Sequence, residues 1–315
     1  MTQAEWGKIY MHIDSVTNDI RRARLGELVA TRQCIRIIEA HNPISAIIAE
    51  NASVSLGSSL GVEEFDGLWS SSLTDSTLHG LPDIEVLDPQ TRLANIRDIF
   101  AVTTKPLIMD GDTGGKVEHF EFFVRNMELA GVSAVIIEDK TGLKRNSLLG
   151  TTVKQVSTDV GEFTAKIRRG KAAQRTPEFM IIARIESLIL DLGMADALTR
   201  ADAYVAAGAD GIMIHSRKSN PGEVLEFARE FRRIHPSVVL ISAPTTYNSI
   251  HAKELQSAGF NVIIYANHML RAAVKAMQDV SMDILRHGRT AEAERRCVGL
   301  EHILHIGPAS ASTRN

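Results

Sequence analysis

The sequence has little of several features that mark particular classes of protein. Its 315 residues include two cysteines, Cys34 and Cys297, which are too few and too far apart for a disulfide framework or a cysteine metal motif. Aromatic residues make up 5%, and 35 basic residues face 38 acidic ones, for a net charge of -3. With few stacking side chains and no excess of positive charge, we expect binding neither to nucleic acid nor to an anionic membrane.

Membrane spans, targeting signals and nucleotide motifs are also absent. No run of about 18 apolar residues occurs, and the first residues, MTQAEWGKIYMHIDS, lack the basic-then-apolar pattern of a secretion signal. We therefore expect a cytoplasmic protein. No GxGxxG follows the first apolar run, and no GxxxxGK[ST] loop is present, so neither dinucleotide binding nor a P-loop is supported.

What the sequence does have is a regular alternation of short apolar runs and helical patterns. With 44% hydrophobic residues, the chain can bury a large core. A helical lead-in (residues 1–33, with the helical pattern at 14–32) precedes eight predicted strands, at residues 34–39, 65–69, 107–109, 134–137, 179–185, 211–214, 238–243 and 261–266. Helical patterns follow them at residues 43–49, 88–100, 119–130, 157–174, 194–207, 222–234, 249–258 and 268–285.

Eight such units in about 250 residues favour a closed (β/α)₈ TIM-type barrel over an open doubly wound sheet. No Pro/Gly/Ser-rich linker divides the chain, so we expect one domain over residues 1–315. The barrel would occupy residues 34–288. A polar tail follows at residues 289–315, and we expect its last residues to be mobile.

Acidic side chains follow two neighbouring predicted strands. Asp110 and Asp112 come after residues 107–109, and Glu138 and Asp139 come after residues 134–137. The carboxyl ends of barrel strands are where active sites lie. Either Asp75 or Asp83, from the preceding long segment, would complete an all-oxygen cluster suited to Mg²⁺. The side chains of Asp110 and Asp112 would point in opposite directions unless the backbone turns between them, which Gly111 permits. The alternative is that the Asp-x-Asp-x-Gly motif caps the following helix or shapes a turn.

Basic and hydroxyl side chains end other predicted strands. Arg184 closes an apolar run and needs an anionic partner, either a substrate carboxylate or phosphate or Glu186 in a structural pair. His215 opens the stretch HSRK (215–218), which we expect to concentrate positive charge at the barrel mouth. The serines after Trp69 would form an anion-binding concavity or a plain Ser-rich turn.

Two long polar segments, residues 69–86 and 140–156, are predicted to be loops without helix at strand ends. Residues 140–149, called the lid below, place Lys140, Lys144, Arg145 and Asn146 around Gly142. A solvated basic loop would have the same composition. Together, these features predict a small, doubly anionic substrate bound on Mg²⁺ beneath a mobile polar lid.

Seven motifs give the chain a specific resemblance. They are EAHNPISA (39–46), GLWSSSLTDST (67–77), DGDTGG (110–115), IIEDKTGLKRNSL (136–148), ARIES (183–187), ADGIMIHSRK (209–218) and YANHMLRAA (265–273). In content and order they resemble the phosphoenolpyruvate mutase branch of the isocitrate lyase superfamily, over residues 34 to about 290. The resemblance implies an isomerase that interconverts phosphoenolpyruvate and phosphonopyruvate, the first step of phosphonate biosynthesis.

The resemblance also implies roles for individual residues. Asp110 would contact Mg²⁺ most directly, and Asp83, Asp112 and Glu138 would reach it through water. The catalytic set would be Asp83, Lys144, Asn146, Arg184 and His215, with Arg184 and His215 on the phosphoryl end. Substrate would also meet Trp69, Ser71, Ser72, Leu73, Leu148 and Ser216. The last helix would be swapped between subunits of a homotetramer.

The alternatives to the mutase are two related enzyme activities and a barrel that has no catalytic activity. Phosphonopyruvate hydrolases have Thr where mutases have the lid Asn, so Asn146 favours the mutase. Carbon–carbon lyases of the superfamily have a catalytic Cys in the lid, which the sequence Lys144-Arg145-Asn146-Ser147 lacks. A barrel kept only for binding or regulation is hard to reconcile with the acids, Arg184, His215 and Asn146 all being present. The lid also lacks the Asp-Gly-Arg run that follows it in some relatives.

Overall fold

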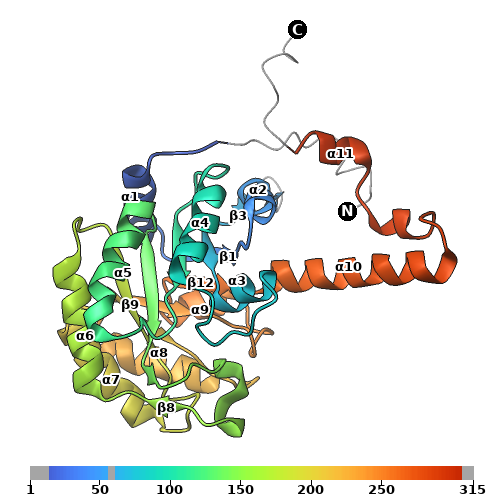
Figure 1. The fold of residues 1–315 in the computed structure, drawn as a ribbon. Helices are drawn as coiled ribbons and strands as arrows, with labels where there is room; N and C mark the ends of the chain where they lie inside the picture. Colours follow the sequence, from blue (N-terminus) through green and yellow to red (C-terminus); the bar gives the residue numbers. More distant parts are fainter. Residues whose placement is uncertain (1–13, 56–60, 307–315) are drawn as a thin grey trace.

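The computed structural model describes residues 14–55 and 61–306, and eight parallel strands close into a barrel at its centre (Figure 1). In order around the barrel they are β1 (Ile35–Glu39), β12 (Val262–Tyr265), β11 (Val239–Ser242), β10 (Gly211–Ile214), β9 (Met180–Ile185), β6 (Ala134–Glu138), β5 (Leu107–Asp110) and β4 (Gly67–Ser70). The predicted (β/α)₈ fold is confirmed. The second barrel strand begins at Gly67 rather than at residue 65.

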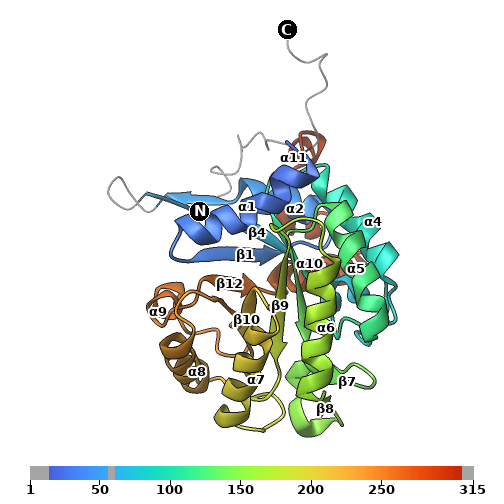
Figure 2. The ribbon, with the colours of Figure 1, turned by 90° about the vertical axis from the view of Figure 1, so that its left-hand side faces the viewer.

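Helices connect consecutive strands and lie outside the barrel (Figure 2). They are α2 (Pro43–Asn51), α4 (Pro89–Phe100), α5 (Val117–Ala130), α6 (Val160–Ala173), α7 (Met194–Ala206), α8 (Gly222–Ile234) and α9 (Ala252–Ser257). Their ends follow local rules. The Asp88 carboxylate caps α4 by accepting from the backbone N–H groups of Gln90 and Thr91 at 3.0 Å. Gly131 ends α5 with φ +91°, a conformation that favours glycine.

The apolar core has two layers separated by the barrel wall. Alternate strand residues point inward and fill the barrel, among them Ile37, Ile108, Ile136, Ile182, Met213, Ile241 and Ile264. The other strand residues point outward and form an outer layer with the inner faces of the helices, to which Val135 on β6 and Phe120 and Val124 on α5 all belong. The barrel interior is therefore a packed core rather than a pore, and a site can form only at one of its ends.

The lead-in helix α1 (Asn18–Thr31) closes the end opposite the strand carboxyl termini. The buried Arg21 guanidinium donates to the carbonyl oxygens of Lys105 at 2.9 Å and Phe100 at 3.1 Å, next to the start of β5. Ser133 Oγ, before β6, donates to the Arg21 carbonyl. The helix predicted in the lead-in is present, and it packs across this end of the barrel. Residues 1–13 lie outside the described residues.

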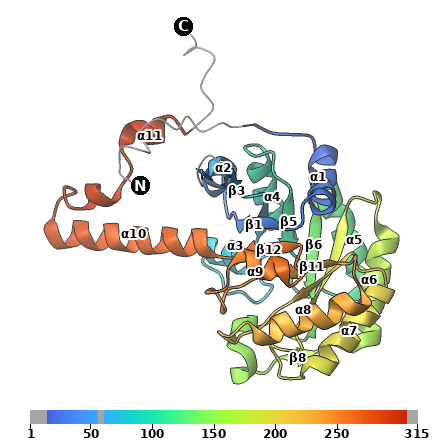
Figure 3. The same ribbon diagram turned by 180° about the vertical axis from the view of Figure 1, so that it is seen from behind.

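Helix α10 (His268–His287) extends away from the barrel (Figure 3). Leu270, in its first turn, is its one buried residue. Further along, Met277, Met282 and Leu285 are 59%, 55% and 79% exposed. After it come η2 (Ala293–Arg296) and α11 (Leu300–Leu304). The predicted mobile tail end, residues 307–315, lies outside the described residues. Within residues 14–55 and 61–306, no helix is both long and apolar enough to cross a bilayer.

The two long polar segments are more ordered than predicted. Residues 69–86 contain a helix, α3 (Ser72–Leu78), so the prediction of a segment without helix is wrong. The face that α3 buries is polar: Ser72, Thr74, Asp75 and Ser76 are all buried. The apolar period that marks most helices is therefore missing.

Residues 140–156 also contain regular structure. A 3₁₀ helix, η1 (Ser147–Thr152), lies between two short antiparallel strands, β7 (Lys140–Thr141) and β8 (Val156–Ser157). A second small hairpin, of β2 (Ser53–Ser55) and β3 (Val62–Glu64), follows α2 and was not predicted.

Candidate active site

A pocket opens at the carboxyl ends of the barrel strands, beneath the lid. Most of the predicted site residues line it: Trp69, Ser71, Ser72, Leu73, Asp83, Asp110, Glu138, Lys144, Asn146, Leu148, Arg184 and His215. Two predicted residues, Asp112 and Ser216, are not among the lining residues. Six others complete the wall without having been predicted: Ser147, Met213, Ala243, Thr245, Ala266 and Asn267.

Asp110, the last residue of β5, lies at the acidic side of the pocket. Ser72 Oγ donates to its Oδ2 at 2.9 Å, and the Asp112 backbone N–H donates to its Oδ1 at 3.1 Å. Burial alone would raise the pKa of Asp110, but the charges of Lys144, Arg184 and Arg92 outweigh it, so the pKa lies below its ordinary value. Asp110 is therefore a carboxylate at neutral pH.

The turn after Asp110 differs in detail from the prediction. Asp112, not Gly111, adopts the left-handed conformation, with φ +54°. Gly111 is needed for space, because a Cβ there would lie 2.6 Å from Val135 Cγ2 and 3.1 Å from the Ile136 carbonyl oxygen. Glycine at position 111 thus lets the two acidic strand ends lie against each other.

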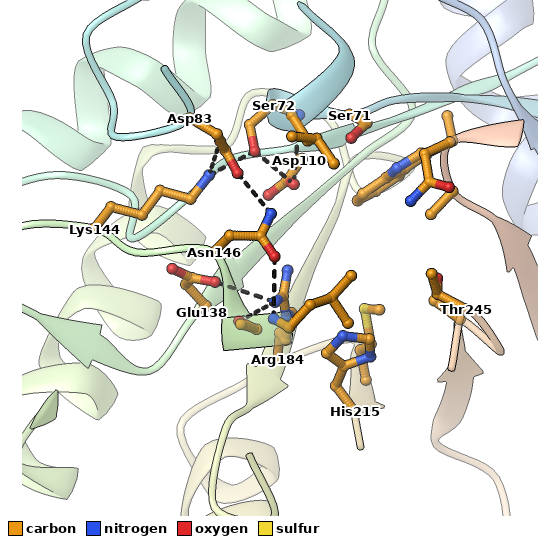
Figure 4. A pocket seen from close by; sticks show the side chains of 18 residues that line it. Ser71, Ser72, Asp83, Asp110, Glu138, Lys144, Asn146, Arg184, His215 and Thr245 are labelled. Carbon is orange, nitrogen blue, oxygen red and sulfur yellow. Dashed lines mark hydrogen bonds and ion pairs between the residues drawn. The ribbon is translucent and has the colours of Figure 1, made fainter. Parts of the chain in front are cut away.

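Lys144 joins the lid to the acidic side of the pocket. Its Nζ donates to Ser72 Oγ and to Asp83 Oδ1, both at 2.6 Å, and it is also paired with Asp112 Oδ1. Beside it, Asn146 Nδ2 donates to Asp83 Oδ2 at 2.9 Å. Figure 4 shows Asn146 between the cluster around Lys144 and the one around Arg184. The lid therefore lies closed over the pocket.

Arg92, on α4, supports this side and was missed by the sequence analysis. Its Nε lies 2.9 Å from Asp75 Oδ2, and its Nη1 donates to the Asp110 carbonyl at 2.6 Å and is paired with Asp112 Oδ2 at 3.3 Å. Of the two acids left open by the sequence, Asp83 lines the pocket and Asp75 is the buried partner of Arg92. The signal that could have found Arg92 is its place on the buried face of a helical pattern, where an arginine requires an acid.

Arg184 lies on the opposite side and makes the structural pair with Glu186 that was one of its two predicted kinds of contact. Its Nε is 2.6 Å from Glu186 Oε1, its Nη2 is 3.3 Å from Glu138 Oε2, and Nη2 also donates to the lid hydroxyl of Ser147 at 2.6 Å. It is thus a structural partner of two carboxylates and a pocket-lining cation. The charges of Arg184 and Lys140 outweigh burial at Glu186 and hold its pKa at about 2.

The two acids at the end of β6 point to different places. Glu138 lines the pocket, and burial raises its pKa to about 7 despite the nearby charges of Arg184 and Lys140. Asp139 is fully buried behind the pocket, where it accepts from the Tyr204 hydroxyl at 2.7 Å and the Glu186 backbone N–H at 2.9 Å. Burial raises the pKa of Asp139 to about 6. Asp139 therefore fixes the backbone beside the site rather than facing a substrate.

The acidic side has the donors that a hard cation requires. Asp110 and Glu138 present carboxylate oxygens to the pocket, and Glu138 Oε1 is buried without a hydrogen bond, its nearest cation being Lys140 Nζ at 3.3 Å. Within residues 14–55 and 61–306, no three His, Cys, Asp or Glu side chains are grouped closely enough to hold a metal by themselves. A site with the two carboxylates of Asp110 and Glu138 suits Mg²⁺, which keeps several waters and takes one or two carboxylates.

His215 directly follows β10, and its side chain is neutral at physiological pH. It is 5% exposed, and burial together with the charge of Arg184 lowers its pKa to about 4. The predicted concentration of positive charge in residues 215–218 is wrong, because Arg217 is paired with Asp191 and Lys218 with Glu223. Ser216 is fully buried and its hydroxyl also donates to Glu223.

Comparison with known proteins bears on this pocket directly. The family model described as phosphoenolpyruvate phosphomutase matches residues 25–285. The chain belongs to the phosphoenolpyruvate phosphomutase family. Every residue that lines the pocket falls within the matched range.

Two curated relatives with similar identity to this chain have different named activities. A phosphonopyruvate hydrolase of Variovorax sp. (strain Pal2) is 35% identical over 269 residues, which are 85% of this chain and 88% of the relative. A phosphoenolpyruvate phosphomutase of Streptomyces hygroscopicus is 36% identical over 265 residues, covering 83% of this chain and 79% of the relative. Identity alone does not separate the two.

Solved structures of family members have the same fold. The crystal structure of phosphoenolpyruvate phosphomutase from Streptomyces platensis subsp. rosaceus matches with a TM-score of 0.83 and 38% identity, over 90% of this chain and 94% of that chain. A phosphonopyruvate hydrolase in complex with oxalate and Mg²⁺ matches with a TM-score of 0.78 and 33% identity, over 92% and 94%. The predicted resemblance to the phosphoenolpyruvate mutase family is confirmed.

Proposed function

We propose that this protein is a phosphoenolpyruvate phosphomutase, which moves a phosphoryl group between the enol oxygen and carbon 3 of one pyruvate unit. The observation that supports it most is Asn146, on the closed lid, with its amide between the acidic cluster and Arg184 (Figure 4). An amide at this position is what the resemblance associates with mutases. Lys144 and Asn146 both donate to Asp83, so the lid itself presents this amide in a fixed place.

Mg²⁺ fits the donors of the pocket. Asp110 would hold it most directly, and Asp83, Asp112 and Glu138 would act through water, as expected for a cation that keeps part of its hydration shell. When bound, it would supply positive charge that stabilises an enolate. The relative that contains Mg²⁺ and oxalate supports this assignment.

The side chains of this protein would bind the two ends of the substrate separately. The wall near the substrate carboxylate would be formed by Trp69, Ser71, Ser72 and Leu73. Arg184 would bind the phosphoryl group through its positive charge. Because His215 is neutral at physiological pH, it would contribute a hydrogen bond and leave the positive charge to Arg184. Phosphoryl transfer needs positioned cations and donors more than a strong base.

The reaction breaks one bond to phosphorus and forms another. Starting from phosphoenolpyruvate, the P–O bond breaks and leaves pyruvate enolate, and carbon 3 of that enolate then forms the P–C bond. Water is the competing acceptor, and its attack would give phosphate and pyruvate. The closed lid would exclude water at this stage.

Hydrolysis of phosphonopyruvate is the second candidate, favoured by the 35% identity to the Variovorax hydrolase. The two activities share substrate, fold and metal, and they differ in whether water reaches the phosphoryl group. Phosphorus NMR of the protein with phosphonopyruvate and Mg²⁺ separates them, because a mutase produces phosphoenolpyruvate and a hydrolase produces inorganic phosphate.

The proposal also covers the location of the enzyme in the cell and its oligomeric state. We place it in the cytoplasm, as a homotetramer in which α10 of one subunit packs on a neighbour. The support is the helix itself: it leaves its own barrel after Leu270 and exposes Met277, Met282 and Leu285. Large apolar side chains gathered on one projecting helix are typical of a protein–protein contact.

A further inference from the structure

Lys140, the first residue of the lid, has a buried ammonium group that has no role in the proposed mechanism. Lys140 is 4% exposed. Its Nζ donates to the Arg145 carbonyl oxygen at 2.9 Å, Ser147 Oγ at 2.9 Å and Gln155 Oε1 at 2.8 Å. An ammonium has three hydrogens, so the lid and the segment after it take all of them.

Two barrel carboxylates lie on the other side of the same ammonium. Glu138 Oε1, at the end of β6, is 3.3 Å from Lys140 Nζ, and Glu186 Oε2, after β9, is 3.5 Å away. Buried charges require opposite charges close by. Lys140 therefore hydrogen-bonds to the lid and the segment after it, and its charge pairs with two carboxylates at the mouth of the barrel.

The partners of Lys140 also touch the pocket. Ser147 Oγ accepts from Arg184 Nη2 at 2.6 Å as well as from Lys140, and Glu138 is paired with Arg184. Gln155 Nε2 donates to the Gly150 carbonyl at 2.7 Å, just past the lid. The backbone of Lys140 pairs with Ser157 through β7 and β8, so the base of the lid does not depend on the lysine side chain.

We propose that Lys140 is a positioning residue whose ammonium holds the lid closed on Glu138 and Glu186 and thereby keeps water from the phosphoryl group. This inference rests on the proposed mutase function. Without the ammonium, the lid retains Lys144 on Asp83 and the Ser147 hydroxyl between Arg184 and Glu186. It loses the bonds from the ammonium to the Arg145 carbonyl, Ser147 and Gln155, and with them the charge that holds this part of the lid against Glu138 and Glu186. Water entering there would attack phosphorus: the P–O bond to water forms, the P–C bond breaks, and carbon 3 takes a proton, giving phosphate and pyruvate.

The test compares Lys140→Met with Lys154→Met, both with phosphonopyruvate and Mg²⁺. Lys154 is an exposed lysine close to the lid that makes no hydrogen bond or ion pair with residues 14–55 or 61–306. Phosphorus NMR gives the ratio of phosphate to phosphoenolpyruvate. We expect Lys140→Met to raise that ratio about tenfold over Lys154→Met, since lid closure suppresses the side reaction with water.

A second readout does not depend on turnover. Trypsin cleaves after the exposed Arg145, and mass spectrometry identifies the cut. We expect this cut to be about tenfold faster in Lys140→Met than in Lys154→Met, because it requires the lid to open. If the wild type forms no phosphoenolpyruvate, the proposed function fails, and the cleavage rates still decide the role of Lys140.

One result would overturn the inference: turnover falls in Lys140→Met while both the product ratio and the cleavage rate stay at the values of Lys154→Met. Lys140 would then act only by neutralising Glu138 and Glu186. If Lys140→Met does not fold, Gln155→Leu takes its place, because it removes one acceptor of the ammonium and leaves both carboxylates paired. Unchanged cleavage and product ratio in Gln155→Leu would equally contradict the inference.

Discussion

Lys144 Nζ lies 2.6 Å from Asp83 Oδ1, and this contact joins the lid to a loop 61 residues earlier in the chain. Lys144 is 5% exposed. Burial alone would lower its pKa, but Asp112, Asp110, Glu138 and Asp83 together raise it well above its ordinary value. The lysine is therefore charged throughout the working range and ties the closed lid to the acids.

Replacing Lys144 with alanine should remove this tie and leave the acids without their nearest cation. We expect kcat/KM to fall by about 100-fold or more, the size typical of losing one charged group at a phosphoryl-transfer site. Steady-state assay of phosphonopyruvate consumption measures it. Lys154→Ala is the control and should stay near the wild type; a similar loss in both variants would mean that lid charge in general, not this contact, matters.

Replacing Asn146 with alanine should lower activity without changing the fold or its stability. We expect Asn146→Ala to keep the circular dichroism and unfolding midpoint of the wild type, because among the described residues its side chain hydrogen-bonds with Asp83 and the Leu148 backbone N–H alone. Turnover should fall by about 100-fold, which is the size of the loss when an enzyme loses one hydrogen-bond donor that stabilises charge in the transition state. Near-normal turnover would remove the lid amide from the mechanism.

A companion substitution tests the choice between the two activities. Asn146→Thr places at the lid the residue that the resemblance associates with hydrolases. We expect the products to shift from phosphoenolpyruvate toward phosphate, measured by phosphorus NMR on the same sample. A threonine variant that still makes phosphoenolpyruvate alone would show that other pocket residues select the reaction.

His215 should make stability depend on pH in a defined direction. Burial and the charge of Arg184 lower its pKa from 6.5 to about 4 in the folded protein. As the pH falls, the unfolded chain takes the proton first, so stability is full above pH 6.5 and is lost between pH 6.5 and about 4. From about pH 7.5 to about pH 5, His215 should contribute a loss of about 2 kcal/mol in the free energy of unfolding.

Urea unfolding of His215→Gln and the wild type at both pH values measures that contribution. The variant should lose less stability on acidification than the wild type, and the difference between the two losses isolates His215 from other titrating groups. Exposed His268→Gln is the control and should follow the wild type. Equal losses in His215→Gln and the wild type would mean that His215 has the same pKa in the folded and unfolded chain, which would contradict its burial as a neutral group.

Helix α10 should hold the oligomer together. We expect Met282→Glu with Leu285→Glu to lower the molar mass in light scattering, because both side chains are exposed on the projecting helix and a charge there opposes an apolar contact. Leu129→Glu, at a 77% exposed position on α5, is the control. An unchanged mass in the double variant would exclude α10 as the contact.

The sequence predicts the barrel well because its signals are local and repeated. Each strand is a short run buried on both faces, such as Ala134–Glu138, and most helices have an apolar face. Because parallel strands of a barrel all end at one rim, residues far apart in the chain, such as Asp110 and Arg184, can be placed at one site from their positions at strand ends alone. Twelve of the predicted site residues line the pocket. Strand-end position accounts for Asp110, Glu138, Arg184 and His215, whereas the substrate roles of Trp69, Leu73 and Leu148 came from the resemblance.

What the sequence could not predict depends on contacts between segments. Helix α3 buries hydroxyls and Asp75, and these positions look exposed until Arg92 is placed against them. The neutral state of His215 comes from burial beside Arg184, which no spacing reports. The substrate contact of Ser216 came from the resemblance, but the side chain is buried and its hydroxyl bonds to Glu223 instead.

The most direct test of the account is phosphorus NMR of the wild-type protein with phosphonopyruvate and Mg²⁺, run again from phosphoenolpyruvate. We predict that the phosphonate and phosphate-ester signals interconvert from both directions, with little inorganic phosphate. Inorganic phosphate as the main product would contradict the mutase and establish hydrolysis. No change with either substrate would contradict both.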